Sequence, residues 1–310
     1  MHVAVVGSGA LGLYYGALLQ RGGTEVSFLA RRDYDAMKSK GLTVRSINGD
    51  FRLDTVRVAR DPSEIGTVDL VLVGLKTFAN SCFSALITPL LNESTLILTL
   101  QNGLGNEEAL AELFGTDRIM GGVAFLCANR GEPGTVHHLG AGRIELGGFG
   151  CLPHNAVGAV AAVFHRGGVD CRVVDDLKMA RWQKLVWNIP FNGLCTLLDR
   201  PVDRLLASVE TRRLVHEIML EVIAAGSAQL QGNRIAPEFA SRMLEFSDGM
   251  GPYQPSMQID YQQGRPLELD AIFARAVAAG NAKGIAMPRT DMLHTLLAAV
   301  SAVNECTAAE

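Results

Sequence analysis

The chain has 310 residues, of which 48% are hydrophobic and 19% are charged. Because single hydrophobic cores usually stop growing near about 250–300 residues, this length predicts two domains, and the apolar composition excludes an intrinsically disordered protein. The formal net charge is −4. That charge excludes nucleic acid as the main partner, since binding to a phosphate backbone needs a clustered excess of lysine and arginine.

The six cysteines are scattered along the chain. They form neither a Cys-x-x-Cys pair nor a cluster with histidine at the spacing of a zinc site. We therefore expect no disulfide framework, no bound metal and a reducing, cytoplasmic location. No uncharged apolar run reaches the roughly 20 residues that a bilayer-spanning helix needs, so we expect no association with a membrane.

The N-terminal segment predicts a β-α-β unit. His2–Val6 is a short β-branched run that stops at Gly7, as a buried parallel strand would. Leu11–Gln20 fits a helix, and Glu25–Leu29 fits a second strand. The chain is therefore expected to open with two strands joined by a helix.

Strand and helix signals continue to alternate after this unit. Asn48-Gly49 is a strong hairpin signal between two apolar runs, and a helical stretch near Phe78–Leu91 separates two later runs. The four expected strands are Leu42–Ile47, Phe51–Val58, Val68–Gly74 and Thr95–Leu100. Strands that alternate with helices predict a doubly wound parallel sheet.

The second half of the chain changes character twice. Residues 118–149 hold short apolar runs broken by glycines, which predicts mixed or antiparallel strands at the far edge of the sheet. A helix at Asn155–Arg166 and a strand at Val169–Val174 are expected next. The remainder is almost wholly helical, with expected helices at Asp176–Leu198, Val209–Leu230, Pro237–Phe246, Leu267–Lys283 and Arg289–Val303.

The segment Gly7-Ser8-Gly9-Ala10-Leu11-Gly12 matches the G-x-G-x-x-G pattern between the first strand and the first helix. Gly7 would make the tight turn, Gly9 would let the backbone approach a pyrophosphate, and Gly12 would allow close packing of helix on strand. The N-terminus of the helix would face the anion. We expect a dinucleotide to bind there; the alternative is a flexible glycine turn. The expected cofactor-binding residues are Gly7, Ser8, Gly9, Ala10, Leu11 and Gly12.

The end of the second strand predicts which dinucleotide binds. A carboxylate at this position accepts from the ribose 2′-hydroxyl of NAD, whereas an arginine pairs with the 2′-phosphate of NADP. Here the strand ends at Ala30-Arg31-Arg32, and Asp33 lies past both arginines, where it suits a helix N-cap. We therefore expect NADPH, bound through Arg31; the alternative is that both arginines are simply solvated.

These elements predict an α/β fold class: an N-terminal doubly wound Rossmann-type sheet and a C-terminal all-helical domain. The expected boundaries are 1–170 for the NADP-binding domain and 171–310 for a helical domain that serves the substrate and dimerisation. The apolar spacing within Met287–Val303 predicts core packing. Part of that surface is a candidate contact with a second copy of the chain, so a homodimer is possible.

Two groups of polar residues follow neighbouring central strands. Leu75-Lys76-Thr77 ends one strand and Leu100-Gln101-Asn102-Gly103 ends the next. Sheets of this kind bind ligands at the carboxyl edge, which makes Lys76 and Asn102 candidate site residues. For Asn102, which stands beside a glycine, an ordinary turn is an equally good interpretation.

A third group lies within the first long C-terminal helix. Lys184, Asn188 and Asn192 recur at i, i+4 and i+8, so they share one face of that helix. A lysine with two amides among aromatic and aliphatic neighbours suits the wall of a pocket. An ordinary polar stripe on an amphipathic helix explains the same spacing.

Taken together, six motifs in this order resemble the ketopantoate reductase family over nearly the whole chain. They are Gly7–Gly12 with Arg31, Leu75-Lys76, Gln101-Asn102-Gly103, Lys184-Leu-x-x-Asn188-x-x-x-Asn192, Ser256-Met257 and Glu268-Leu269-Asp270. The resemblance implies an NADP-dependent oxidoreductase of the 2-dehydropantoate 2-reductase type. Such an enzyme reduces 2-dehydropantoate, a small 2-oxo acid, to pantoate in pantothenate biosynthesis.

The resemblance also implies a role for each matching residue. Lys184 would be the general acid that protonates the substrate carbonyl, which agrees with the need of a ketone for a positive proton donor. Asn102 would contact cofactor and substrate, and Lys76 would lie near the cofactor. Glu268 would accept from the 4-hydroxyl of the substrate, so that the catalytic set is Lys184, Glu268 and Asn102. The substrate-binding residues would be Asn188, Asn192, Ser256 and Glu268.

Two other functions stay open at this point. One is reduction of a different 2-oxo acid with NADPH, since fold alone does not choose the substrate. The other is a non-catalytic sensor that binds NADPH and reports it to a partner. The lysine, asparagines and glutamate of the second half favour an enzyme, because a sensor needs the motifs of the first domain alone.

Overall fold

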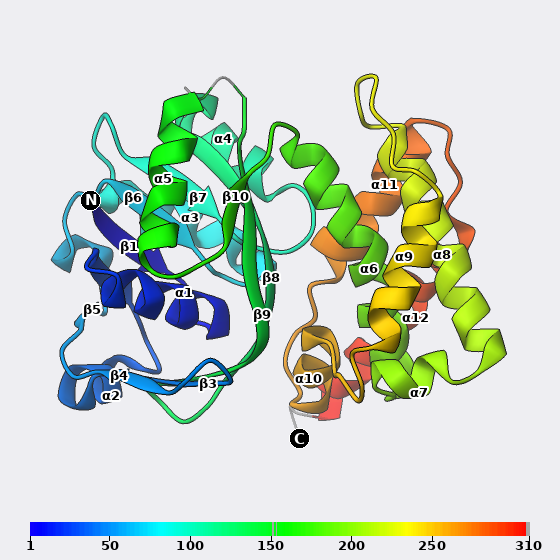
Figure 1. Cartoon of the computed structure of the whole chain (residues 1–310), viewed down its shortest axis with the longest axis horizontal. Coiled ribbons are helices and arrows are strands. Elements are labelled where there is room, and N and C mark those ends of the chain that lie inside the picture. The colour runs from blue at the N-terminus through cyan, green and yellow to red at the C-terminus, as the bar shows by residue number, and fades with distance from the viewer. Residues whose placement is uncertain (151, 153, 308–310) are drawn as a thin grey trace. The chain divides into compact units, whose positions relative to one another are not determined.

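The computed structural model describes residues 1–150, 152 and 154–307. The chain divides into two compact units, Met1–Asn102 with Asn106–Leu177 and Gly103–Gly105 with Lys178–Glu310 (Figure 1). The sequence places the division after residue 170, just before strand β10 (Cys171–Val173). This strand pairs in parallel with β9 (Thr135–Gly148), and it therefore belongs to the first unit.

The first unit is built on a sheet of ten strands in the described part of the chain, ordered β4-β3-β9-β8-β7-β6-β1-β2-β5, with β10 on β9. The strands not yet given are β1 His2–Val6, β2 Glu25–Leu29, β3 Leu42–Ser46, β4 Phe51–Leu53, β5 Arg57–Ala59, β6 Leu70–Val73, β7 Leu96–Thr99 and β8 Ile119–Arg130. Six neighbours, β5-β2-β1-β6-β7-β8, are all parallel. The expected doubly wound sheet is confirmed.

The hairpin predicted at Asn48-Gly49 is confirmed, but the prediction of a single strand at Phe51–Val58 is wrong. Val44 of β3 pairs with Phe51 of β4 in antiparallel register, and Gly49 has a φ of +105°, which a glycine tolerates best. The predicted strand Phe51–Val58 is instead two strands, β4 and β5. They lie at the two opposite ends of the sheet order, because β4 pairs with its hairpin partner β3, whereas β5 pairs with β2, about 30 residues earlier in the chain.

The short link between β4 and β5 requires the sheet to curl. The four residue steps from Leu53 to Arg57 span at most about 14 Å. In a flat sheet, however, the strand spacings of about 4.8 Å between β4 and β5 would add up to about 38 Å. Helix α1 (Ala10–Arg21) contacts β2 near one end of the order and β3 and β9 near the other. The sheet thus wraps around α1.

The long strands β8 and β9 are antiparallel, as expected, but they do not lie at the edge. β8 also pairs with β7, and β9 also pairs with β3. The β3–β4 hairpin therefore lies beyond them and forms the end of the sheet. This pairing brings residues 43–46 onto residues 135–138, a partnership that local sequence cannot indicate.

Alternate residues of the central strands point into two apolar layers. Val3 and Val5 face α1 and α5 (His154–Arg166), whereas Ala4 and Val6 face the opposite side, where α4 (Asn106–Phe114) packs. The helical stretch expected near Phe78–Leu91 is present, but it consists of three short helices, η2 (Thr77–Cys82), α3 (Phe83–Ile87) and η3 (Thr88–Leu90). Pro89 falls inside that stretch and cannot donate a helical hydrogen bond.

The second unit is helical, which confirms the fold class. Its helices are α6 Leu177–Leu198, α7 Val202–Leu206, α8 Val209–Ser227, α9 Glu238–Asp248, α10 Ser256–Gln262, α11 Arg275–Ala282 and α12 Pro288–Thr307, with a π-helix, η5, at Asp270–Ala274. Trp182 of α6 is buried against Gly226 of α8, where an added Cβ would lie 3.0 Å from the indole. Leu293 of α12 lies closer still to Gly193 of α6, where an added Cβ would be 2.5 Å from the leucine side chain.

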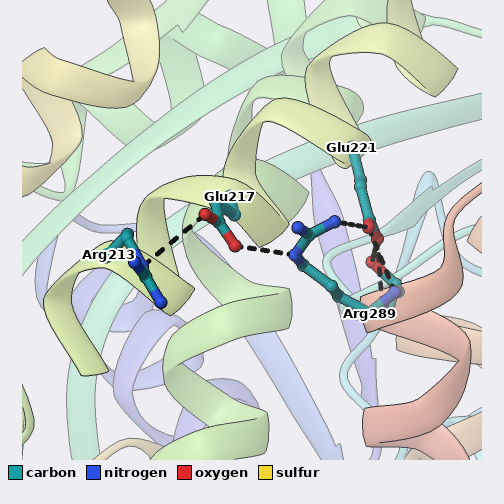
Figure 2. A network of polar contacts seen from close by, with 5 residues as sticks. Arg213, Glu217, Glu221 and Arg289 are labelled. Atoms are coloured by element: carbon teal, nitrogen blue, oxygen red, sulfur yellow. Dashed lines mark hydrogen bonds and ion pairs between the residues drawn. The ribbon is translucent and has the colours of Figure 1, made fainter. Parts of the chain in front are cut away.

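An ionic network fixes the start of α12 to α8 (Figure 2). Glu221 accepts from the backbone N–H groups of Arg289 and Thr290 at 3.1 and 3.0 Å, so it caps the N-terminus of α12. The Arg289 guanidinium bonds both Glu221 and Glu217, which raises its pKa above the ordinary value. Arg213 contacts the far side of Glu217 at 3.7 Å.

Candidate active site

The phosphate loop contains two glycines that the fold itself requires. Gly7 has a φ of +103°, and an added Cβ would lie 2.5 Å from the backbone nitrogen of Leu75. A Cβ on Gly12 would lie 2.2 Å from the carbonyl oxygen of Gly7. Ser8 Oγ donates to the carbonyl of Leu29 at 2.8 Å and fastens the loop to the end of β2.

Gly9 is different from these two glycines. The nearest atom to an added Cβ there is the carbonyl oxygen of Gly74, at an ordinary 3.8 Å, so the protein alone would accept a side chain. Gly9 is also the N-cap of α1 without a side-chain cap. The first N–H groups of α1 have no carbonyl within the helix to bond, and they carry the positive end of its dipole. The loop therefore fits a pyrophosphate that approaches over Gly9.

The segment after β2 has two exposed arginines and a buried aspartate. Arg31 and Arg32 are exposed, whereas Asp33 is only 2% exposed. Asp33 is at the N-cap position of α2 (Tyr34–Lys40), as predicted, but its side chain makes no cap hydrogen bond. Instead it accepts from Arg130 and from the backbone N–H of Gly134. Asp33 is thus occupied elsewhere in the fold.

A chain of amides connects the segments that carry Lys76 and Asn102. Gln101 Nε2 donates to Asn80 Oδ1 at 2.8 Å, and Asn80 Nδ2 donates to Asn106 Oδ1 at 3.0 Å. Asn106 Nδ2 then donates to the carbonyl of Asn102 at 2.9 Å. The half-buried Lys76 precedes η2, which carries Asn80. Both predicted residues therefore belong to one hydrogen-bonded edge at the ends of β6 and β7.

The polar face of α6 is largely buried. Asn188 is 6% exposed and Asn192 is 4% exposed, while Lys184 is half-buried. Asn192 Oδ1 accepts from the backbone N–H of Met257 at 3.4 Å, which attaches the start of α10 to α6. Ser256, the first residue of α10, is exposed. The structure thus links Asn192 to the segment that carries Ser256.

Asp199 makes a second attachment between these helices. It has a φ of +48° just after α6, and its Oδ1 accepts from Gln258 and Gln262 of α10 at 3.1 and 2.6 Å. The hydrogen bonds from Gln258 and then Gln262 lower the pKa of Asp199. The sequence analysis did not single out Asp199. The available signal was an aspartate directly after the expected end of a helix, because Asn and Asp tolerate the left-handed conformation best among the non-glycine residues.

Glu268 lies two residues before the first residue of the π-helix η5 and is 6% exposed. Its carbonyl accepts from the N–H of Ile272 at 3.3 Å. The segment Gly103–Gly105 packs against η5: Leu104 N–H donates to the carbonyl of Ala271 at 2.9 Å, and a Cβ on Gly103 would lie 2.4 Å from that oxygen. Single-turn π-helices are frequent at functional sites, and no sequence signal indicated this one.

Each unit therefore gathers its own part of the predicted residues. In the first unit the phosphate loop, Arg31, Lys76 and Asn102 all follow the carboxyl ends of adjacent strands β1, β2, β6 and β7. In the second unit the residues lie on α6, α10 and the segment before η5. Among the described residues, no group of three or more histidine, cysteine or acidic side chains could hold a metal ion. No helix in that part of the chain combines the length and apolar character of a membrane span.

Two family profiles match the chain. "Ketopantoate reductase PanE/ApbA" covers residues 3–150, and "Ketopantoate reductase PanE/ApbA C terminal" covers residues 176–301. The chain belongs to the ketopantoate reductase family. The resemblance predicted from the six motifs is confirmed, and the matches to both halves are those expected of an oxidoreductase of this family.

Individual relatives agree with the family assignment. A 2-dehydropantoate 2-reductase from Nostoc sp. is 39% identical over 296 residues, which cover 94% of this chain and 92% of the relative. The crystal structure of 2-dehydropantoate 2-reductase from Geobacter metallireducens is 63% identical with a TM-score of 0.95, covering 96% of this chain and 99% of that one. A D-mandelate dehydrogenase in complex with NADH and anilino(oxo)acetate, 24% identical over 98% and 99% of the two chains with a TM-score of 0.91, shares the fold.

Proposed function

We propose that the chain catalyses the NADPH-dependent reduction of 2-dehydropantoate to pantoate, a step of pantothenate biosynthesis. The observation that carries the proposal is the match of both ketopantoate reductase profiles, one to residues 3–150 and one to 176–301. The 2-dehydropantoate 2-reductases that are 39% and 63% identical support the same substrate. The reaction belongs to the oxidoreductases that act on CH–OH groups.

The loop between β1 and α1 fits the pyrophosphate of a nicotinamide dinucleotide. Gly9 leaves room that the packing of the protein does not require, and the N-terminus of α1 offers backbone donors to an anion. Bound there, the nicotinamide would supply the hydride. Gly7 and Gly12 keep the loop in its tight conformation, and Ser8 holds it to β2.

The preference for NADPH over NADH rests on the segment after β2. Arg31 and Arg32 are exposed cations at the position that reads the adenosine ribose, and the carboxylate of Asp33 is bonded to Arg130 and Gly134. An acid that is buried in this way cannot accept from a ribose 2′-hydroxyl. Arginine remains as the recognising group, and a 2′-phosphate is its natural partner.

For the second unit we propose one role for each polar residue. Lys184 donates the proton to the carbonyl oxygen of the 2-oxo acid, since an ammonium both polarises the carbonyl and stabilises the forming alkoxide. Glu268 accepts from the 4-hydroxyl, and Ser256 donates to the carboxylate. The residues proposed to complete the substrate and cofactor contacts are Asn188 and Asn192 of the second unit and Asn102 and Lys76 of the first.

The test is NADPH oxidation with 2-dehydropantoate and with 3,3-dimethyl-2-oxobutanoate, which differs from it only by lacking the 4-hydroxyl. The wild type is expected to prefer 2-dehydropantoate, and Glu268→Ala is expected to remove most of that preference, because only the hydroxylated substrate loses a hydrogen bond. A wild type that turns over both compounds equally would assign a simpler 2-oxo acid. Binding of NADPH without turnover of any 2-oxo acid would instead indicate a sensor.

A homodimer and a cytoplasmic location stay predictions. The prediction of a homodimer is supported by two exposed apolar side chains, Met292 and Leu296, which lie one turn apart on α12.

A further inference from the structure

The segment after β2 carries two carboxylates close to its two arginines, and each carboxylate is paired with an arginine from elsewhere. Asp35 bonds Arg60 at 2.8 Å, and its side chain is 82% exposed. Asp33 bonds Arg130, and its side chain is 3% exposed. The two carboxylates therefore lie in very different surroundings, Asp35 in water and Asp33 in the interior, although the side chain of its partner Arg130 is 30% exposed.

The Asp33–Arg130 pair joins parts of the first unit that are 97 residues apart. Arg130 is the last residue of β8, and the buried Gly134 ends the turn before β9. Asp33 Oδ2 accepts from Arg130 Nη2, and Oδ1 accepts from Gly134 N–H at 3.0 Å. Both oxygens of the carboxylate are held, so the charge of Asp33 has a fixed position two residues from Arg31.

A buried carboxylate held in a fixed position beside an anion site disfavours the binding of a phosphate there, because the two negative charges repel each other. The repulsion is strong where the effective dielectric constant is low, whereas a charge exposed to water, such as that of Asp35, is screened. Arg130 cancels the charge of Asp33 and leaves the positive potential of Arg31 and Arg32 for the ligand. A ribose 2′-hydroxyl carries no charge and does not depend on this cancellation.

We propose that Arg130 is a specificity-determining residue for the 2′-phosphate of NADPH and that it acts through Asp33. Arg130 neutralises Asp33, the buried carboxylate of this segment, whereas Asp35 is exposed to water. The inference rests on the NADPH preference proposed above, and it concerns a residue on the far hairpin that no motif of the sequence indicated.

The test measures binding rather than turnover. Adenosine 2′,5′-bisphosphate and adenosine 5′-phosphate differ by the 2′-phosphate alone, and calorimetry gives the affinity of the protein for each. Arg130→Met keeps the apolar stem and removes the charge. We expect it to weaken binding of the bisphosphate about tenfold while the monophosphate changes less than about twofold. The matched control is Arg172→Met, which breaks the exposed Arg172–Asp170 pair of the same unit and should leave both affinities unchanged.

The double variant Arg130→Met/Asp33→Asn identifies the route of the effect. Asparagine keeps an acceptor for Gly134 N–H but carries no charge, so the double variant should recover most of the lost bisphosphate affinity. If it stays as weak as Arg130→Met, Arg130 touches the phosphate itself and the inference fails. Equal losses for both nucleotides would show a merely structural role and would also overturn it.

Two further variants keep the test decisive. Should Arg130→Met fail to fold, Asp33→Asn alone is expected to bind the bisphosphate at least as well as the wild type, and a selective loss would contradict the proposal. Arg31→Ala tests the underlying NADPH preference separately. If the wild type does not distinguish the two nucleotides, or Arg31→Ala does not abolish the distinction, the cofactor proposal fails; if only Arg130→Met has no effect, the present inference alone fails.

Discussion

The phosphate loop of the first unit and the polar face of α6 in the second are two different ways to build a site. The loop is made of backbone, and its glycines are explained by φ angles and by atoms that an added Cβ would meet. The face of α6 is made of side chains, which depend on contacts such as that of Asn192 with Met257 of α10. The first is set by a few consecutive residues, and the second by segments distant in the sequence.

This difference predicts separable defects. Changes in the loop should alter cofactor affinity or the stability of the first unit and leave the chemical step intact. Changes on α6 should alter the chemical step and leave cofactor affinity intact. Each experiment below breaks one side of the comparison and uses the other as its reference.

The largest effect is expected for Lys184→Ala. A positioned general acid is worth about 10²–10⁴ in rate, and the loss should fall mainly on kcat because the alkoxide develops only near the transition state. The affinity for NADPH, measured by fluorescence titration, should stay that of the wild type. Lys178→Ala, an exposed lysine of the same helix, is the control. A variant with normal kcat and lost cofactor binding would contradict the assignment.

Buried thiols offer a reporter in each unit. Burial raises the pKa of Cys171 in the first unit and of Cys195 in the second to about 12. At pH 8 their thiolate fractions are therefore about a thousandfold below that of an ordinary cysteine, and alkylation should be slower by a similar factor than at the exposed Cys82.

Mass spectrometry of the alkylated protein measures each position separately. Added NADPH should slow the labelling of Cys171, since a ligand that binds the folded state suppresses the openings of the unit that holds it. Labelling of Cys195 should change less. Equal protection of both cysteines would show that the two units open together.

Within the loop, Gly9 and Gly12 should respond in opposite ways. Gly9→Ala meets no close protein atom, so the melting temperature should stay the same while NADPH affinity falls about tenfold, because the methyl group occupies the path of the pyrophosphate. Gly12→Ala forces a Cβ to 2.2 Å from a carbonyl oxygen and should cost about 1–3 kcal/mol of stability. Unchanged affinity in Gly9→Ala would remove the main support for the loop as the pyrophosphate site.

The smallest effect is expected at the Arg212–Asp248 pair between α8 and α9. The hydrogen bond from Arg212, at 2.7 Å, lowers the pKa of Asp248. A lowered carboxyl pKa stabilises the fold above the ordinary pKa, near 3.9, and this contribution is lost as the pH falls through the lowered value. Asp248→Asn should therefore destabilise by about 0.2–1 kcal/mol at pH 7.

Thermal unfolding at two pH values and two salt concentrations checks this prediction. The difference between wild type and Asp248→Asn should shrink in acid and at high salt, because the pair is exposed and screened. If the stability difference between wild type and Asp248→Asn persists at a pH below the lowered pKa of Asp248, it comes from packing rather than from charge.

The sequence was sufficient where structure is local. The β-branched runs around Val5 and Val71 are buried parallel strands, Asn48-Gly49 turns a hairpin, and the glycine loop lies between β1 and α1. In each case the signal and its cause lie within a few residues. The same reason made the i, i+4 spacing on α6 visible.

What the sequence did not indicate depends on distant partners. Nothing within residues 51–58 shows that its two halves join opposite ends of a sheet. The amide chain joins Asn80 to Gln101 and Asn106 across more than twenty positions, and Asp33 finds its partner at Arg130. Asp33 also corrects the predicted helix cap, because the guanidinium of Arg130 competes better for the buried carboxylate than the backbone N–H groups of α2 do.

The curl of the sheet around α1 has a consequence for the energetics of cofactor binding. Residues 12–19 of that helix are all buried, so the packing around the helix holds its first turn in place when an anion arrives. Donors that already stand in their final positions cost no ordering entropy at the moment of association, and more of the interaction energy then appears as affinity. The enclosed helix thus makes the anion site preorganised, and the β4–β5 link that closes the curl contributes to that rigidity without touching the ligand.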